Sequence, residues 1–115
     1  MLPAPGQGAL AVTIREGDTV ASARVATVAD VRTSAAVSAE RAALHALRAG
    51  CHAPVGALAL VEDGRVTLRV RLLAPDGSDA LEVKVEGGIG ETVAIGRRAA
   101  EDLLGRGGGR WLTTP

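Results

Sequence analysis

The feature that most constrains the fold is a set of three apolar segments separated by two turn signals. Residues 55–61 are apolar throughout, and the Asp-Gly pair in "EDGR" at 62–65 is a strong signal for a tight hairpin loop. Residues 65–73 alternate between apolar and polar, and residues 81–86 do the same after a second turn, "APDGS" at 74–78. Such alternation is typical of strands with one buried face, so this region predicts a three-stranded antiparallel meander.

The charged residues of the meander fall on one predicted face. Arg69 and Arg71 can lie opposite Glu82 or Glu86, where each exposed pair would stabilise the sheet by roughly 0.5 kcal/mol. This pairing explains the charges without an anion-binding site. The apolar residues on the opposite face, which we expect in the core, are Val66, Leu68, Val70, Leu72, Leu81, Val83 and Val85.

Two helices flank the predicted sheet. One covers residues 35–49, with Gly50 placed to end it in a left-handed conformation, and the other covers residues 91–104. The side chains expected to be buried are Val37, Leu44 and Leu47 in the first helix and Val93, Ala100, Leu103 and Leu104 in the second. Glu40, Arg41 and Arg48 are expected on the wetter side of the first helix. The order of elements favours an α+β fold, a three-stranded antiparallel sheet with helices packed on one face.

A short strand-helix segment precedes this unit. The prolines and glycines of residues 2–8 impose an extended or turning backbone, and we predict a strand at Ala9–Ile14. A weakly amphipathic helix is predicted over Thr19–Arg32, with Asp18 as its N-cap. The sequence "GQGALA" has the outline of a dinucleotide-binding loop, but prolines precede it and a strand follows it, so we interpret it as a backbone crossing that needs two glycines.

Composition argues against several classes of function. Thirteen basic and thirteen acidic residues give a net charge of 0, and one aromatic residue provides no stacking platform, so we expect no nucleic-acid partner. The single cysteine excludes an internal disulfide, and with two histidines it offers no metal site of known spacing. No apolar run approaches the roughly 18 residues of a membrane span, and the first residues lack a secretory pattern. We therefore expect a cytoplasmic protein without a membrane partner.

The one cysteine, Cys51, follows the first predicted helix directly, in "RAGCHAPVGA". The commonest role for such a cysteine is that of a small buried apolar residue. A catalytic pair with His52 is disfavoured, because side chains adjacent in sequence rarely point at each other and no orienting third group is evident. The negative end of the helix dipole would also raise the pKa of a thiol at this place. The position suits a covalent anchor better than a nucleophile that turns over.

Three blocks of the chain resemble one known family in their order and spacing. They are "LPAPGQGALAV" at 2–12, "AERAALHALRAGCHAPVGA" at 39–57 and "LAPDG" at 73–77. Together they resemble the C-terminal part of porphobilinogen deaminase, also called hydroxymethylbilane synthase. The resemblance spans almost the whole chain, with Ala49 as a small departure where the family usually has glycine.

The resemblance implies a transferase of tetrapyrrole and haem (porphyrin) biosynthesis, which condenses four porphobilinogen molecules into hydroxymethylbilane with release of ammonia. It implies a dipyrromethane cofactor that carries the growing pyrrole chain and is attached covalently to Cys51. Gln7 and Gly8 match a segment that lines the cofactor cleft, and Arg41 matches a structural or interdomain ion-pair position. Residues 1–33 would supply the closing strand and helix of the first domain, and residues 34–115 would form the third, cofactor-carrying domain.

The family's catalytic aspartate and its substrate-binding arginines lie in N-terminal domains that have no counterpart here. The resemblance therefore implies no catalytic residue and no metal site in this chain, and we expect the isolated chain to be inactive. The alternative is a stand-alone, non-catalytic α+β module that binds a protein partner or a tetrapyrrole-like ligand. The two hypotheses differ at the surface, because a part of a larger enzyme would expose the apolar side chains of residues 9–33, whereas a stand-alone module would not.

Overall fold

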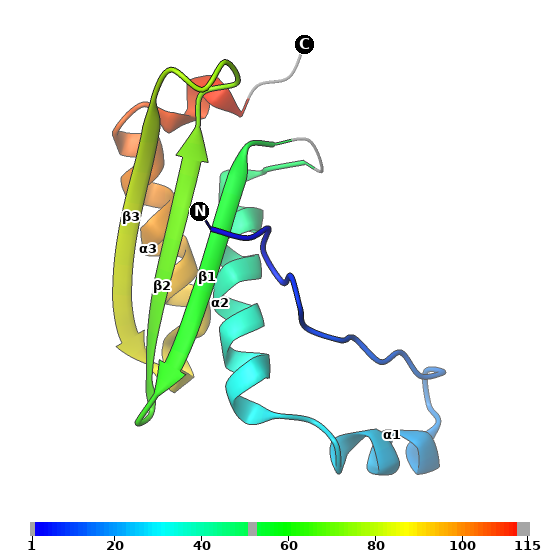
Figure 1. The fold of residues 1–115 in the computed structure, drawn as a ribbon. Coiled ribbons are helices and arrows are strands. Elements are labelled where there is room, and N and C mark those ends of the chain that lie inside the picture. The colour runs from blue at the N-terminus through cyan, green and yellow to red at the C-terminus, as the bar shows by residue number, and fades with distance from the viewer. Residues whose placement is uncertain (1, 51–52, 113–115) are drawn as a thin grey trace.

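The computed structural model describes residues 2–50 and 53–112. The elements in chain order are α1 (Thr19–Ala26), α2 (Val31–Leu47), β1 (Val55–Glu62), β2 (Arg65–Leu73), β3 (Ala80–Gly88), a 3₁₀ turn (Ile89–Glu91), α3 (Thr92–Gly105) and a second 3₁₀ turn (Gly108–Trp111). The strands form one antiparallel sheet in the order β1-β2-β3, and α2 and α3 cover one of its faces (Figure 1). The predicted α+β fold is confirmed.

The hairpin between β1 and β2 has the predicted two-residue loop. Glu62 pairs with Arg65, and both loop residues have positive φ angles, 49° at Asp63 and 73° at Gly64. Two successive left-handed residues are what a type I′ turn requires, and its twist matches that of the flanking strands. This turn sets the register of the sheet and thereby decides which side chains face the helices.

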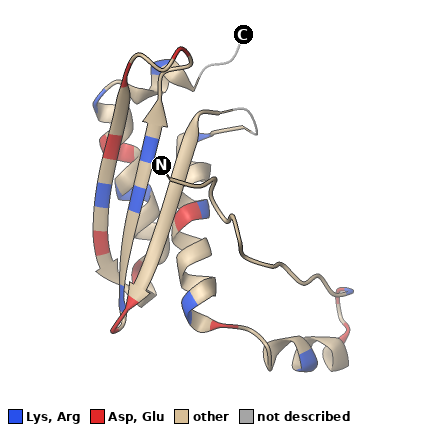
Figure 2. Cartoon of the chain, in the orientation of Figure 1, with Lys and Arg blue, Asp and Glu red and all other residues tan. Residues whose placement is uncertain are grey.

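The sheet places the predicted apolar residues in the core. Val66, Leu68, Val70 and Leu72 of β2 are fully buried, and the apolar residues of β3 are half-buried against the same cluster. On the open face, Arg69 of β2 binds Glu82 of β3 at 2.7 Å, which confirms a cross-strand pair. Figure 2 shows basic residues on β2 beside acidic and basic residues on β3. Arg71 is the direct neighbour of Glu82 in the register, but the structure pairs that carboxylate with Arg69.

The two sheet-covering helices bury smaller residues than the sequence predicts. In α3 the buried stripe runs through Ile95, Ala99 and Leu103, whereas Val93 and Leu104 are 55% and 42% exposed. These two predictions were wrong because both residues lie about a quarter turn outside that stripe. In α2 the buried apolar residues are Ala35, Ala39, Ala43 and Leu47, while Val37 and Leu44 are only half-buried.

Small residues face the core because α2 and α3 pack closely at Gly96. A Cβ atom added there would lie 2.5 Å from the Cβ atom of Ala42 and 2.6 Å from the carbonyl oxygen of Ala39. Only glycine fits such an approach of two backbones. The chain has one tryptophan and no phenylalanine or tyrosine. Its aliphatic core is therefore filled by bringing the backbones of α2 and α3 close together instead of by large aromatic side chains.

The N-terminal arm, which we define as residues 9–30, departs from the prediction. Residues 9–15 form no strand, and Leu10 and Val12 are 95% and 62% exposed, because no neighbouring strand lies beside them in the part of the chain that the structure describes. The predicted helix over Thr19–Arg32 is two helices, since Asp30 caps α2 and interrupts the pattern. Asp18 is the N-cap of α1 as predicted, accepting the Ala21 N–H at 2.9 Å.

The arm extends away from the sheet and its two covering helices (Figure 1). None of the residues of α1 is fully buried. The radius of gyration, 15.4 Å, exceeds the value of about 13 Å expected for a compact chain of this length. The apolar surface expected over residues 9–33 is thus present, with Val20, Val28 and Val31 also exposed. No helix within the described ranges has the length and apolar character to cross a membrane.

Candidate functional site

The loop between α2 and β1 carries Cys51 and His52, which both lie outside the described residues. The described ends of the loop are fixed. The N–H of Ala53 donates to the carbonyl oxygen of Gly50 at 3.0 Å, and the N–H of Leu73 in β2 donates to the carbonyl oxygen of Pro54 at 3.0 Å. The loop therefore joins a helix and a sheet at points that backbone hydrogen bonds hold in place.

The helix before this loop ends earlier than predicted. Arg48, not Gly50, adopts the left-handed conformation, with φ 54° and ψ 38°. The N–H of Arg48 donates to the carbonyl oxygen of His45, and the N–H of Ala49 donates to that of Leu44. These two bonds form a Schellman motif, which holds a non-glycine residue in this conformation and moves the helix end by two residues.

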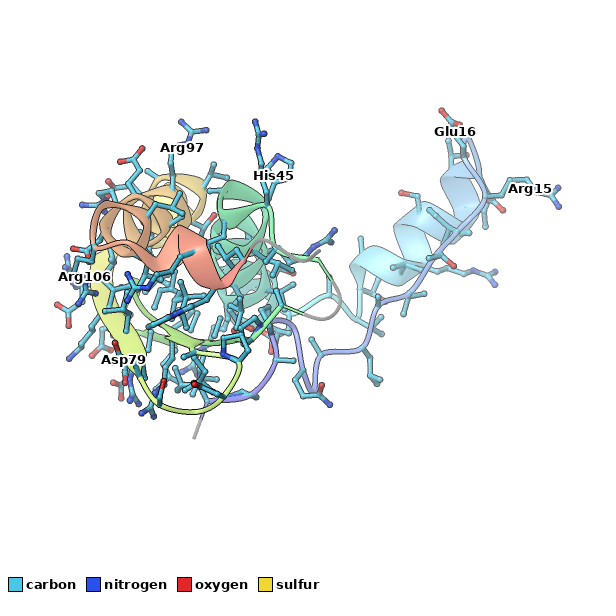
Figure 3. The ribbon with its side chains drawn as sticks, turned by 90° about the horizontal axis from the view of Figure 1, so that it is seen from above. Arg15, Glu16, His45, Asp79, Arg97 and Arg106 are labelled. Atoms are coloured by element: carbon cyan, nitrogen blue, oxygen red, sulfur yellow. The ribbon has the colours of Figure 1, made fainter. Side chains whose placement is uncertain are left out.

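Basic side chains line the outer side of the same helix end. Arg41, His45 and Arg48 are exposed and, with Leu44 and Ala49, surround a shallow depression of about 440 Å³. His45 points away from the sheet, on the same side as Arg97 of α3 (Figure 3). The positive charge of Arg48 at the helix C-terminus is favourable because it opposes the negative end of the dipole. Positive charge thus stands next to the loop that carries Cys51.

The second part of the candidate site is the segment of residues 2–8, whose first residues contact β1 near the start of that strand. The N–H of Ala57 donates to the carbonyl oxygen of Pro3 at 2.8 Å. Beside it, a Cβ atom at Gly56 would lie 2.9 Å from the carbonyl oxygen of Leu2, so glycine permits this close approach. The segment therefore begins beside the first residues of β1, close to the end of the Cys51 loop (Figure 1).

Gln7 and Gly8 lie in a pair of tight turns at the end of this segment. Gly6 and Gly8 have φ angles of 73° and 85°, which favour glycine, but no backbone crosses there, because an added Cβ atom at either residue would meet nothing within 4 Å. The two glycines therefore serve a turn and not the predicted crossing. The N–H of Gln7 donates to the carbonyl oxygen of Ala4 at 3.1 Å. Both Gln7 and Gly8 are exposed, so the Gln7 side chain and the backbone at Gly8 are accessible to a ligand or a neighbouring domain.

One carboxylate joins the two parts, and the prediction that it lies on the wetter side of its helix was wrong. Glu40 is 5% exposed and faces inward from α2. Its Oε1 accepts the N–H of Gly6 at 2.7 Å, and its Oε2 accepts the N–H of Ala59 in β1 at 3.0 Å. A signal for this was available, because Glu40 stands four residues before Leu44 and next to Ala39 and Ala43, on the side of the helix that turns inward.

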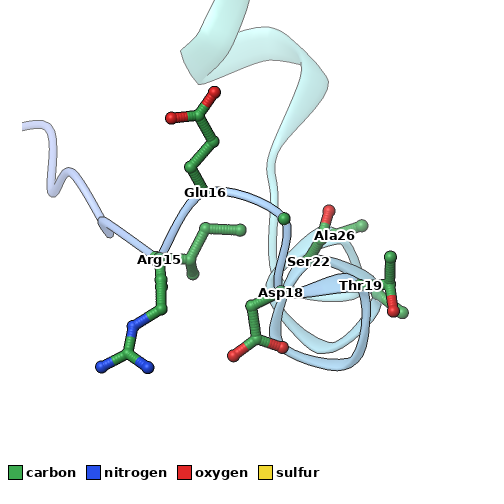
Figure 4. A pocket seen from close by; sticks show the side chains of 9 residues that line it. Arg15, Glu16, Asp18, Thr19, Ser22 and Ala26 are labelled. Carbon is green, nitrogen blue, oxygen red and sulfur yellow. The ribbon is translucent and has the colours of Figure 1, made fainter.

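A separate hollow of about 430 Å³ lies in the arm, between the loop at residues 14–18 and α1 (Figure 4). Asp18 is engaged there as a helix cap, and the Arg15 and Glu16 side chains point in different directions, so no polar groups converge. Among residues 2–50 and 53–112, no cluster of three histidine, cysteine, aspartate or glutamate residues could hold a metal ion.

Comparison with known proteins adds a second line of evidence. The family model described as "Porphobilinogen deaminase, C-terminal domain" matches residues 34–105. Curated porphobilinogen deaminases are similar over nearly the whole chain: that of Thermus thermophilus is 47% identical over 94% of the chain, that of Moorella thermoacetica 44% over 96%, and that of Mycobacterium tuberculosis 48% over 90%. The chain spans only about 36% of the length of the first two and 37% of the third.

Proposed function

Since the chain belongs to the porphobilinogen deaminase family and matches its C-terminal domain, we propose that it is the cofactor-carrying part of a cytoplasmic hydroxymethylbilane synthase. The complete enzyme would condense four porphobilinogen molecules into hydroxymethylbilane with release of ammonia. The observation that carries this proposal is the family match over residues 34–105, which includes the loop of Cys51. Porphobilinogen, the growing pyrrole chain and the remaining domains of the enzyme would be the partners.

Cys51 would be the attachment point of a dipyrromethane cofactor. A single cysteine suffices, because one thioether holds the group, and the cofactor when bound supplies the end to which pyrrole units are added. The described surroundings suit such a group: the loop has fixed ends, and Arg41 and Arg48 present positive charge beside it. The carboxylates of a pyrrole oligomer would be attracted to that charge.

Gln7 and Gly8 would line the cleft that holds the cofactor. Their exposure and the hydrogen bond that joins Pro3 to Ala57 of β1 support this role. Neither residue can act as an acid or a base, so their contribution would be hydrogen bonding and close backbone approach. The acid–base and anion-binding groups of the reaction would come from domains outside this chain.

The arm would pair with another domain of the complete enzyme. Its exposed Leu10, Val12 and Ile14 repeat at the period of a strand, yet they contact no neighbouring strand within the described parts of the chain. Residues 1–33 would then complete the first domain, and residues 34–115 would form the third. The family match, which begins at residue 34, supports that division. The alternative, a stand-alone binding module, does not explain why the apolar side chains of the arm are exposed.

Intact-mass measurement of the complete enzyme tests the attachment. We expect the wild-type protein to carry the added mass of one dipyrromethane, and the Cys51→Ser variant to carry none and to be inactive. The His52→Ala variant is the matched control, since it changes the adjacent residue and keeps the thiol. An adduct that persists without Cys51 contradicts the assignment. In a separate assay of product formation, the isolated 115-residue chain should produce no hydroxymethylbilane, because the proposed catalytic carboxylate belongs to another domain.

A further inference from the structure

Glu40 is the one fully buried charged residue among those that the structure describes. A buried carboxylate is unfavourable unless hydrogen bonds compensate for the water that it has lost. Here each oxygen accepts one backbone N–H, from Gly6 at 2.7 Å and from Ala59 at 3.0 Å. No lysine or arginine pairs with it within residues 2–50 and 53–112. The charge therefore serves to hold two backbone segments.

These two segments are far apart in sequence and otherwise weakly joined. Gly6 is 34 residues from Glu40, and Ala59 is 19 residues from it. Beyond Pro3, the other hydrogen bonds of the turn that carries Gln7 and Gly8 lie within the turn itself. The bond from Gly6 to Glu40 is thus the link that orients the turn relative to the sheet.

The same helix leads to the loop of Cys51. From Glu40, α2 continues for two turns to Leu47 and ends in the Schellman motif at Arg48. The buried faces of Ala43 and Leu47 pack this part of α2 into the core, so it is a rigid connection. Glu40 therefore couples the position of Gln7 and Gly8 to α2, the helix that directly precedes the loop of Cys51.

We propose that Glu40 is a positioning residue of the enzyme, whose carboxylate holds the Gly6–Gly8 turn in register with the Cys51 loop. It touches neither substrate nor cofactor and acts through Gly6. This inference rests on the proposed function for its role in the reaction, but the contact itself can be tested without any activity.

The first experiment measures amide hydrogen exchange by NMR in the 115-residue chain. In Glu40→Gln, one of the two acceptor oxygens is replaced by an NH₂ donor. The remaining oxygen should stay with the buried N–H of Ala59, because an unpaired buried donor is the more costly loss. We expect exchange at Gly6 to accelerate about tenfold or more, while the amides of β2 keep their protection. Glu62→Gln, at the exposed end of β1, is the control. It should change neither the exchange rate of Gly6 nor the protection of the β2 amides.

Two outcomes of that experiment overturn the proposal. If Gly6 exchanges at the same rate in the variant and the wild type, the carboxylate does not hold the turn. If all protected amides accelerate by the same factor, Glu40 contributes to global stability only. A second variant, Gly6→Ala, strains the same turn at its φ of 73° and leaves Glu40 unchanged. It should reproduce the local acceleration around Gln7.

The second experiment measures kcat/KM of the complete enzyme, normalised to the fraction of molecules that carry the cofactor mass. We expect Glu40→Gln to retain the adduct and to lose about tenfold in kcat/KM, because the turn is misplaced. An unchanged value per loaded molecule overturns the role in the reaction even if Gly6 is released. If the wild type carries no adduct, the proposed function fails, while the exchange experiment still decides whether Glu40 holds the turn.

Discussion

The sheet with its two helices and the N-terminal arm contain the same kinds of residue and have opposite environments. Leu68 in β2 is fully buried, whereas Leu10 in the arm is 95% exposed. Both stand in segments that alternate at the period of a strand. The difference is that β2 has a hydrogen-bonded neighbour on each side and the arm has none among the described residues. Alternation selects a face, but a strand forms only where another strand satisfies its backbone.

The largest expected effect separates these two leucines. Leu68→Ala should lower the free energy of unfolding by about 2–5 kcal/mol, because it leaves a cavity in a core that cannot collapse freely. Leu10→Ala should change it by less than about 0.5 kcal/mol, because the side chain is already in water. Urea denaturation of the isolated chain measures both. Similar losses for the two variants would show that the arm packs in solution.

The next effect tests the close helix pair within the core. Gly96→Ala should destabilise the chain by about 1–3 kcal/mol, because the new Cβ atom meets the backbone of α2 at 2.6 Å. Gly105→Ala in the same helix is the matched control, since open space surrounds its added Cβ atom. That variant should be neutral or stabilising, because alanine has the higher helix propensity. A stabilised Gly96→Ala chain would contradict the close packing.

Limited proteolysis compares the two regions directly. Trypsin should cut the isolated chain at Arg15 or Arg24 in the arm at least about tenfold faster than at Arg69 in β2, because the arm is held by few buried contacts. Mass spectrometry of the first fragments identifies the sites. In the complete enzyme the difference should shrink, since we propose that another domain covers the arm. Equal cleavage rates at the arm and at β2 in the isolated chain would contradict the difference in local stability between these two regions.

The smallest effect concerns the helix caps. Hydrogen bonds from the Thr33 hydroxyl and the Arg32 N–H lower the pKa of Asp30 below its ordinary value of 3.8. Its contribution to stability is therefore complete above pH 3.8 and is lost as the pH falls through the lowered value. Asp30→Ala should slightly lower the unfolding midpoint at neutral pH, and the difference should shrink as the pH falls below 3.8. Asp18→Ala, which uncaps α1 in the arm, should leave the midpoint of the core unchanged.

The candidate site was only partly predictable. The motif around Cys51 and the need for glycine at positions 6 and 8 can be found in the sequence, because turns and motifs are local. The buried carboxylate of Glu40 was predicted to lie on the wetter side of its helix, since a charged residue is usually exposed. Its inward position depends on two N–H groups that are brought to it by other segments.

What the sequence by itself determined is the three-stranded meander with its Asp-Gly hairpin and its buried face on β2. Those properties follow from the period of two and from turn chemistry, which act between neighbours in the chain. Only the tertiary structure decided that Arg48 ends α2, that Gly96 sets the distance between the helices, and that Glu40 joins Gly6 to Ala59. The positions of Gly96 and Glu40 depend on contacts between residues that are distant in sequence. The end of α2 depends on which of two possible end residues, Arg48 or Gly50, adopts the left-handed conformation, and the sequence pattern favoured the glycine.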